Sequence, residues 1–280
     1  MIQELRQIFP LALLLSIAQI PRATYYYHVK YQVEPDKYSR AKEEIAVIYH
    51  ENKGRYGYRR ITTDLRCRGF AINHKTVQRL MRELGLVCRV RMKKYKSYKG
   101  EVGKVAPDLL QRDFEATKPN QKWVTDVTEF SLFGEKLYLS PILDLCSRDI
   151  VSYALSDKPV LSMVTRMLDK AFAQIPDGTE LILHSDQGWQ YQHRQYQRML
   201  TDKGIRQSMS RKGNCLDNAV IENFFGLLKR ELLYLQDFQS MQHFKAELVD
   251  YLDYYNTRRR KEKLKGLPPA LHRLQALSAA

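Results

Sequence analysis

The sequence predicts an α/β protein in which an all-α region precedes a mixed sheet flanked by helices. Three observations predict this class. Residues 38–86 carry apolar side chains at helical spacing, residues 122–156 alternate as strands do, and strands and helices then follow one another to about residue 235. At 280 residues, with 44% hydrophobic and 11% aromatic content, the chain is long enough for two to three folded domains.

The chain is strongly basic, with 46 Lys and Arg against 31 Asp and Glu, a net charge of +15. This excess favours nucleic acid over a membrane as the partner. The apolar run 11–17 is far shorter than the ~20 residues of a membrane span. We therefore interpret it as a core-facing helix and place the chain in the cytoplasm. The four cysteines form no CxxC pair, so the sequence does not favour structural zinc.

The helical region contains a helix-turn-helix candidate. "SRAKEEIAVIYHEN" and "RRITTDLRCR" have helical periodicity, and Asn73 is a suitable N-cap for "HKTVQRLMREL". The outer face of this last helix carries Lys75, Arg79 and Arg82, which we expect to contact DNA. A small helical bundle with a solvated charged face is the alternative. "LLLSIAQIPRATYYYH" has a similar but weaker helix-turn-helix pattern.

A basic stretch, "CRVRMKKYKSYKGEVGK", follows the helices. Between Arg89 and Lys104 it has seven basic residues and one acid, and Tyr95 and Tyr98 stand among them. Basic charge with aromatic rings suits contact with a nucleic-acid backbone and stacking on bases. A solvated linker is the alternative.

The second half of the chain predicts strands and helices in the order β-β-β-α-β-α-β-α. The strands are "KWVTDVTEFSL", "KLYLSPILDL", "DIVSYALS", "ELILHSD" and "IRQSMS". The helices are "LSMVTRMLDKAFAQI", "HRQYQRMLTDKG" and "AVIENFFGLLKRELLYL". In this order the first and fourth strands are able to lie side by side at the sheet centre. We divide the chain into a helix-turn-helix region (1–88), a basic linker (89–118), an α/β core (119–236) and a basic helical tail (237–280).

Three acids of the α/β core stand where a hydrophobic core disfavours them. Asp126 lies inside the first strand, Asp186 ends the fourth, and Glu222 opens the last helix. Each alone has an ordinary explanation, because acids are common in turns and in first helical turns. Together, clustered carboxylates repel one another unless a cation neutralises them. Oxygen-only ligands suit Mg²⁺ or Mn²⁺, and two such ions about 4 Å apart promote phosphoryl transfer.

The motifs "WVTDVTEF", "HSDQGWQY" and "SRKGNCLDNAVIENFFGLLKRE" resemble those of the DDE transposases of bacterial insertion sequences, the "IS three" family, and of retroviral integrase cores. As in that pattern, 35 residues separate Asp186 from Glu222. The resemblance implies an RNase H-like catalytic core in which Asp126, Asp186 and Glu222 hold two Mg²⁺ (or Mn²⁺) ions. It implies DNA strand cleavage and 3′-end joining, and that Lys229 contacts the transposon end. We assign Arg211 and Lys212, at the basic start of the third motif, to the DNA contacts as well.

The resemblance also implies partners: the terminal inverted repeats, target DNA and further copies of the chain. The chain is similar to a second-frame product, so the first-frame product, or a frameshift fusion with it, is a further expected partner. The tail departs from the family pattern, since Lys261 stands where a His is common and Pro268 where a Ser is common. Only the role of the tail is affected.

Three other functions compete with this one. A stand-alone nuclease would use the same carboxylates but would not need basic segments on both sides of the core. A sequence-specific regulator would use only the helix-turn-helix. A tyrosine recombinase would need an Arg-rich cradle around one nucleophile, and no coherent set is present. We expect joining, because basic residues flank the core in 89–104 and in the tail, at Arg258, Arg259, Arg260, Lys261, Lys263 and Lys265.

Overall fold

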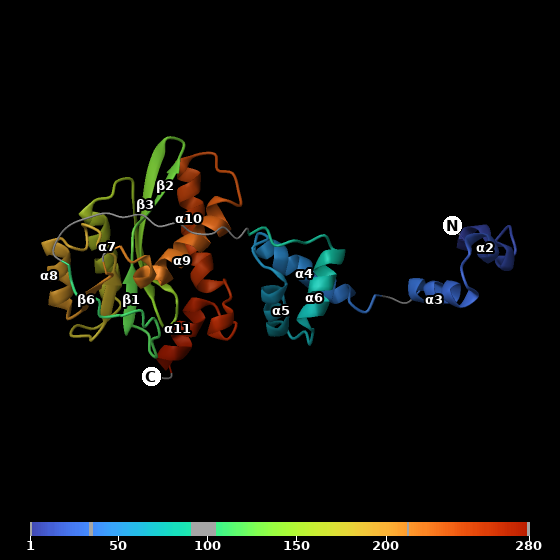
Figure 1. Ribbon diagram of the computed structural model, residues 1–280, viewed down its shortest axis with the longest axis horizontal. Helices are drawn as coiled ribbons and strands as arrows, with labels where there is room; N and C mark the ends of the chain where they lie inside the picture. The colour runs from blue at the N-terminus through green and yellow to red at the C-terminus, as the bar shows by residue number, and fades with distance from the viewer. Residues whose placement is uncertain (1, 34–35, 91–104, 212, 279–280) are drawn as a thin grey trace.

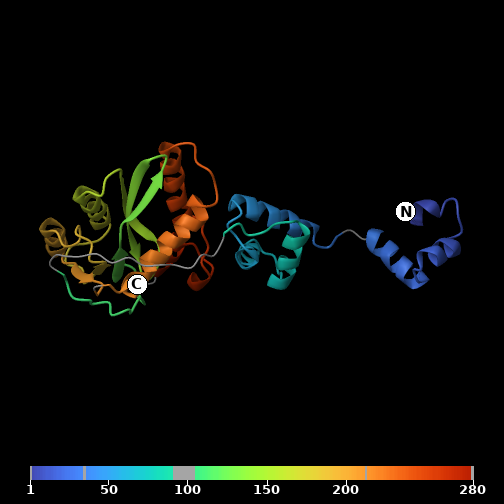
Figure 2. The same ribbon diagram turned by 45° about the horizontal axis from the view of Figure 1, so that its top comes forward.

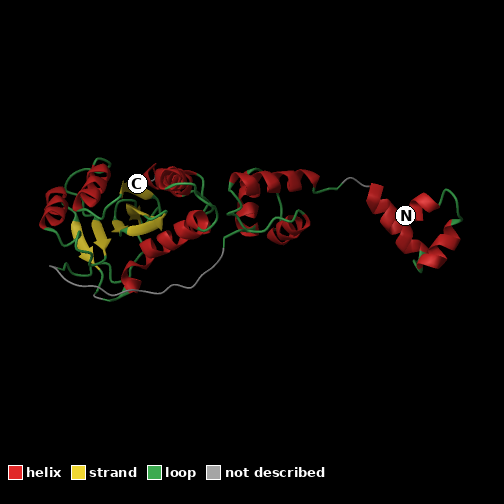
Figure 3. Cartoon of the chain, turned by 90° about the horizontal axis from the view of Figure 1, so that it is seen from above, coloured by secondary structure: helices red, strands yellow, loops and turns green. Residues whose placement is uncertain are grey.

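The chain forms three regions that follow one another along the long axis of the molecule (Figures 1 and 3). The structure is a computed structural model that describes residues 2–33, 36–90, 105–211 and 213–278. The first two regions are helical, with α1 (Ile2–Leu5), α2 (Leu11–Ala18) and α3 (Arg22–Val33), then α4 (Ser39–Glu51), α5 (Tyr58–Cys67) and α6 (His74–Glu83). The third region holds the sheet. The expected order, helices before an α/β core, is confirmed.

The apolar run 11–17 forms α2, and only one face of this helix is buried. Leu14 and Leu15 are buried, whereas Leu13 is 50% and Ile17 72% exposed. Helices α1 to α3 stand apart from the other regions (Figure 2), and Tyr25 of α3 is buried as well. The expected core-facing helix is therefore confirmed for the face that carries Leu14 and Leu15 and is wrong for Leu13 and Ile17. Within the described ranges, no helix has both the length and the apolar character needed to cross a membrane.

Helices α4 to α6 form a three-helix unit around a small apolar core. Ile45, Ile61, Leu65 and Val77 are fully buried there. The cap of α6 is the predicted one, because the Asn73 side chain accepts a hydrogen bond from the Lys75 backbone N–H at 2.9 Å. This satisfies one of the amides that a helix leaves unpaired at its start.

The sheet is mixed, and β3 and β5 flank β1 at its centre. The strands are β1 (Lys122–Thr125), β2 (Thr128–Leu132), β3 (Glu135–Asp144), β4 (Ile150–Ser156), β5 (Ile182–Ser185) and β6 (Arg206–Met209). β1 and β2 pair with different parts of β3 in antiparallel fashion, and β4 also pairs with β3. β1 pairs with β5, and β5 with β6, in parallel. The expected contact between the first and fourth predicted strands is confirmed.

The first predicted strand is broken in two, which corrects the expectation that Asp126 lies inside a strand. Asp126 and Val127 separate β1 from β2. The Val127 N–H donates to its neighbour's carboxylate, Asp126 Oδ1, at 2.7 Å. An Asp side chain that binds a nearby backbone N–H competes with the sheet ladder in this way. The break places Asp126 at the carboxyl end of β1.

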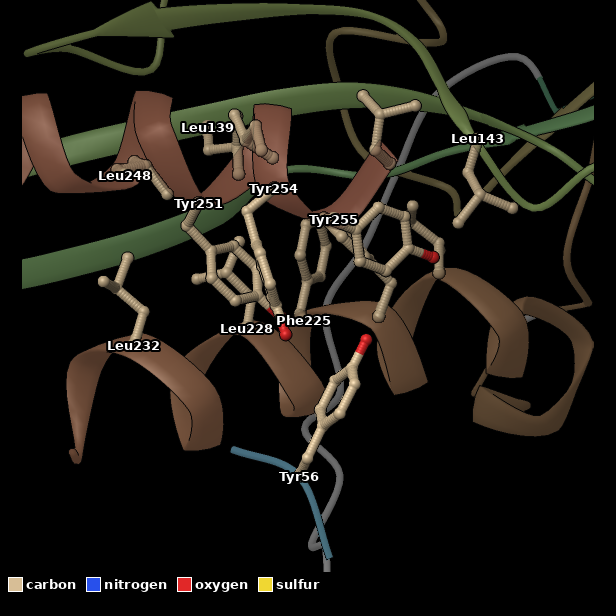
Figure 4. Packing of buried hydrophobic residues seen from close by; sticks show 14 of the residues in the cluster. Tyr56, Leu139, Leu143, Phe225, Leu228, Leu232, Leu248, Tyr251, Tyr254 and Tyr255 are labelled. Carbon is tan, nitrogen blue, oxygen red and sulfur yellow. The ribbon is translucent and has the colours of Figure 1, made fainter. Parts of the chain in front are cut away.

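Helices cover both faces of the sheet, and the two faces of β1 belong to different cores. Trp123 packs into the core beside α7 (Leu161–Phe172) and α8 (Arg194–Lys203). Val124 packs into the core beside α9 (Ala219–Leu228) and α10 (Met241–Thr257). In Figure 4 leucines, tyrosines and a phenylalanine of α9 and α10 interlock beneath β3. The chain ends with α11 (Pro269–Ser278).

A buried carboxylate joins the α4–α6 unit to the sheet region. Glu231 lies in the π-helical turn η2 (Lys229–Leu233) that follows α9, and it is 1% exposed. Both of its carboxylate oxygens accept from Arg259 at 2.8 Å, and the Tyr251 hydroxyl donates to it at 3.0 Å. Arg60 of α5 lies 3.4 Å away, and the Arg55 guanidinium donates to the Glu231 carbonyl at 2.9 Å. These contacts dock the helical unit on the core.

Several basic side chains of the tail are buried or paired with other residues, whereas the sequence predicts that they are exposed. Arg259 is 3% exposed and bound to Glu231, so its expected place on a DNA-binding surface is wrong. Arg260 pairs with Asp64 of α5 at 3.0 Å. Lys261 donates to the Tyr255 hydroxyl, and burial, aided by the Arg259 charge, lowers its pKa well below the usual value. Lys263 and Lys265 are exposed, as expected.

Candidate catalytic site

Asp126 and Asp186 occupy equivalent places at the ends of two neighbouring parallel strands. The pairing of β1 with β5 matches Val124 with His184, and each Asp lies two residues further on. Adjacent strands lie about 4.8 Å apart, so the two aspartates leave the sheet side by side. Asp186 Oδ1 also accepts the Gly188 N–H at 2.9 Å. The turn role of Asp186 and a ligand role are therefore compatible.

Glu222 reaches the same sheet edge from α9. It lies in the first turn of that helix, directly after the buried Ile221. The start of α9 is held against β1, because the Asn218 side chain donates to the Thr125 carbonyl at 3.5 Å. The structure thus brings all three predicted acids to the carboxyl end of β1, from three separate elements.

The electrostatics show that the three carboxylates influence one another. Burial raises the pKa of Asp126 well above its ordinary value, and the charges of Asp186 and Glu222 raise it further. The Val127 N–H and the Lys229 charge act in the opposite direction. Burial also raises the pKa of Asp186, against the Gly188 hydrogen bond. A buried cluster of this kind favours protons or cations over free charge.

Among the described residues, no three Asp, Glu, His or Cys side chains are already arranged around a single metal position. Mg²⁺ is commonly bound by one or two carboxylates and keeps several waters. The oxygen-only donor set of Asp126, Asp186 and Glu222 suits a hard divalent cation.

Lys229 lies beside the carboxylates rather than in open solvent. It is half-buried at the junction of α9 and η2, and its ammonium lies 5.7 Å from the centre of the Phe130 ring. Burial lowers its pKa, and the charges of Asp126 and Glu129 raise it. The charges of Lys229 and Asp126 therefore act on one another, while the contact of Lys229 with DNA stays a prediction.

Arg211 has a protein partner that the sequence did not indicate. Its guanidinium binds both oxygens of Asp217 at 2.9 Å, and Arg112 donates to the same carboxylate at 2.9 Å. Asp217 is 1% exposed, and the Arg211 hydrogen bonds hold its pKa far below the ordinary value, against the effect of burial. This network fixes the loop that leads to Glu222. Lys212 lies outside the described residues.

The predicted DNA-contacting residues of α6 are exposed. Lys75, Arg79 and Arg82 follow one another at helical spacing, and all three reach solvent. Arg79 pairs with Glu83 and lies over the Tyr38 ring at 5.3 Å, so part of its charge is already matched. Arg89 is exposed, while residues 91–104 of the predicted basic linker lie outside the described residues.

Replacing Lys75, Arg79 and Arg82 together by Ala is expected to weaken DNA binding and to flatten its salt dependence. Removing one phosphate contact lowers the slope of log affinity against log salt concentration by about 0.9. Fluorescence anisotropy with a labelled duplex at several salt concentrations measures this slope. The matched control replaces three exposed arginines near α8, Arg194, Arg198 and Arg206. If the triple variant keeps the wild-type slope, the charged face of α6 does not contact DNA and is the solvated face of a small helical bundle.

Comparison with known proteins places these features in one family. The chain is 56% identical over 98% of its length, and 97% of the relative, to the putative transposase InsK of insertion sequence element IS150 from Escherichia coli K12. It is 34% identical to the transposase InsF of insertion sequence IS3A from the same organism, over 80% of this chain and 79% of that protein. The chain belongs to the "IS three" family of insertion-sequence transposases.

Domain families match this transposase in three places. An HTH-like domain matches residues 37–94, and integrase core domains match residues 116–215 and 222–277. An uncharacterized transposase-like protein of Haemophilus influenzae is 51% identical over 74% of this chain and 95% of that protein. Among solved structures, the HTLV-2 integrase catalytic core domain in complex with magnesium covers 56% of this chain and 97% of that chain, at 20% identity and a TM-score of 0.46.

Several residues of this region escape prediction from the sequence. Arg112 and Asp217 are 105 residues apart, and Glu231 and Arg55 are 176 apart. No local pattern marks such pairs. The one available signal was a charged residue, Glu231, within the apolar periodicity of "FFGLLKRELLYL".

Proposed function

We propose that this transposase cleaves DNA at the ends of its element and joins the freed 3′ ends to a second duplex, with Asp126, Asp186 and Glu222 as ligands of two Mg²⁺ or Mn²⁺ ions. The observation that carries the proposal is the convergence of these carboxylates at the carboxyl ends of β1 and β5. Two divalent ions at such a site supply Lewis-acid stabilisation of the attacking and leaving oxygens of a phosphodiester.

The groups around the carboxylates orient the two aspartates and supply positive charge for the DNA. The Val127 and Gly188 N–H groups orient Asp126 and Asp186, so that little reorganisation is needed on substrate binding. Lys229 supplies a positive charge for the DNA backbone beside the cluster. A Cβ added at Gly226, between Glu222 and Lys229, meets no atom within 4 Å, so this face of α9 is open to DNA.

We also propose the binding partners and the domain organisation of this transposase. The substrates are terminal inverted repeats and target DNA, and pairing of two ends calls for a homo-oligomer. The first-frame product, or a fusion with it, completes end recognition. We place the protein in the cytoplasm on the nucleoid, and we retain the division into a helix-turn-helix region, linker, catalytic core and tail at 1–88, 89–118, 119–236 and 237–280.

Joining separates this function from that of a nuclease on the same core. A pre-nicked element end with a free 3′-hydroxyl is mixed with target DNA, Mg²⁺ and the protein, or its frame-fused form if this chain alone is silent. We expect a joined product that resists denaturant and protease, without ATP, because the 3′-hydroxyl replaces water as the oxygen nucleophile. Cleavage without joining would favour the nuclease, and a DNA–tyrosine adduct would overturn the mechanism.

A further inference from the structure

A basic pocket lies between the helix-turn-helix unit and the C-terminal segment, and Asp126, Asp186 and Glu222 are not among its lining residues. Its volume is about 330 Å³. Arg59 and Arg66 of α5 and His74, the first residue of α6, line one side. Arg260 and Glu262 of the tail line the other. We call this the junction pocket, since it exists only where the two parts of the chain meet.

The two sides of the junction pocket are held together by specific contacts. The Arg260 N–H donates to the Tyr56 hydroxyl at 2.8 Å, and the Arg260 guanidinium pairs with Asp64 at 3.0 Å. Tyr56 is fully buried and points its hydroxyl toward the α9–α10 core (Figure 4). A Cβ on Gly266 would approach Thr63 Cγ2 to 2.7 Å, so the tail touches α5 directly. The pocket therefore has a defined shape rather than being a gap between loose parts.

The charges in the junction pocket favour an anion. Arg60, a further lining residue, and Arg260 are matched by Glu231 and Asp64. Arg59 and Arg66 are exposed, and in the part of the chain that the structure describes no acid lies within ion-pair distance of either. The start of α6 adds the positive end of a ten-residue helix. Arginine side chains bind phosphate oxygens through paired N–H groups.

We propose that the junction pocket binds a backbone phosphate of the DNA that α6 contacts, so that one duplex touches both the helix-turn-helix unit and the C-terminal segment. This inference rests on the proposed function. In a helix-turn-helix the first helix crosses the DNA backbone while the second enters the groove. Arg59 and Arg66 lie on that first helix, and Lys75 of the recognition face directly follows His74. The contact would fix the DNA path relative to the catalytic core.

Two variants with opposite expected effects test the junction pocket in the full-length protein. Replacing Arg59 and Arg66 by Ala removes the phosphate contact of the pocket, which lowers the salt slope of binding to a labelled random-sequence duplex by about 0.9. Glu262→Gln removes an acid that lines the pocket from the tail, so we expect tighter binding. Arg194→Ala with Arg198→Ala, an equal loss of exposed charge on α8, is expected to leave the slope unchanged.

The outcomes distinguish the pocket from the function on which it rests. If the wild-type protein neither binds nor joins DNA, both proposals fall. If it binds and joins, and the Arg59/Arg66 variant keeps the wild-type slope, the junction pocket is overturned and the function stands. If that slope falls but Glu262→Gln does not tighten binding, the arginines act on DNA without the tail, and the shared site is overturned.

Discussion

Asp126→Asn, Asp186→Asn and Glu222→Gln are each expected to lower the rate of DNA cleavage in Mg²⁺ by about a thousandfold or more. Loss of one carboxylate ligand weakens metal stabilisation of the transition state, a contribution of several kcal/mol, and about 4 kcal/mol corresponds to a factor of a thousand. Cleavage of a labelled element end, followed on denaturing gels, measures the rate. DNA affinity is expected to change little.

Asp202→Asn serves as the matched control, because it makes the same chemical change at an exposed ion pair on α8. Its cleavage rate is expected to equal that of the wild type. Near-wild-type cleavage by any one of the three variants would remove that residue from the proposed site.

The carboxylate cluster also predicts that the wild type and Asp126→Asn differ in stability in metal-free buffer. The pKa of Asp126 is raised in the folded protein, so the folded state binds this proton more tightly than the unfolded state. Stability from this group is present at low pH and is lost as pH rises through the raised pKa. At pH 8 without metal, Asp126→Asn is therefore expected to have a higher Tm than the wild type. Thermal denaturation with and without Mg²⁺ checks this, and Mg²⁺ should raise the Tm of the wild type more.

Glu231→Gln is expected to destabilise the protein by about 3–5 kcal/mol, because it leaves Arg259 buried without its counter-charge. The variant also loosens the contacts of Arg55 and Arg60 that dock the helix-turn-helix unit. Denaturant unfolding followed by circular dichroism measures the loss. Glu247→Gln is the matched control, since Glu247 pairs with Lys53 at a partly exposed position and such pairs contribute about 0–1 kcal/mol.

The difference in stability between the wild type and Glu231→Gln is expected to become smaller at low pH. Burial raises the pKa of Glu231, but Arg259 and the other hydrogen-bonding and charged neighbours outweigh it, so the net pKa is lowered. A lowered carboxyl pKa contributes stability above the unfolded value of about 4.3 and loses it as pH falls through the folded value. The gap between wild type and Glu231→Gln should therefore shrink below about pH 4. A gap that is constant with pH would show that the charge of Glu231 is not the cause.

The sequence by itself predicted the class of fold, the candidate acids and the cap of α6. These features depend on local patterns: apolar spacing sets helices and strands, Asn73 caps its own helix, and each acid interrupts an apolar segment. The order of the elements also allowed the first and fourth predicted strands to lie side by side, as β1 and β5 do.

Only the tertiary structure decided which charges are free for DNA. Arg259, Arg211 and Arg59 look alike in the sequence, but Arg259 is buried against Glu231, Arg211 is bound to Asp217, and Arg59 lines the junction pocket. The break at Asp126 likewise depends on a side chain that takes a sheet N–H for itself. The physical reason is that burial and pairing depend on partners up to 204 residues away, and no local pattern encodes them.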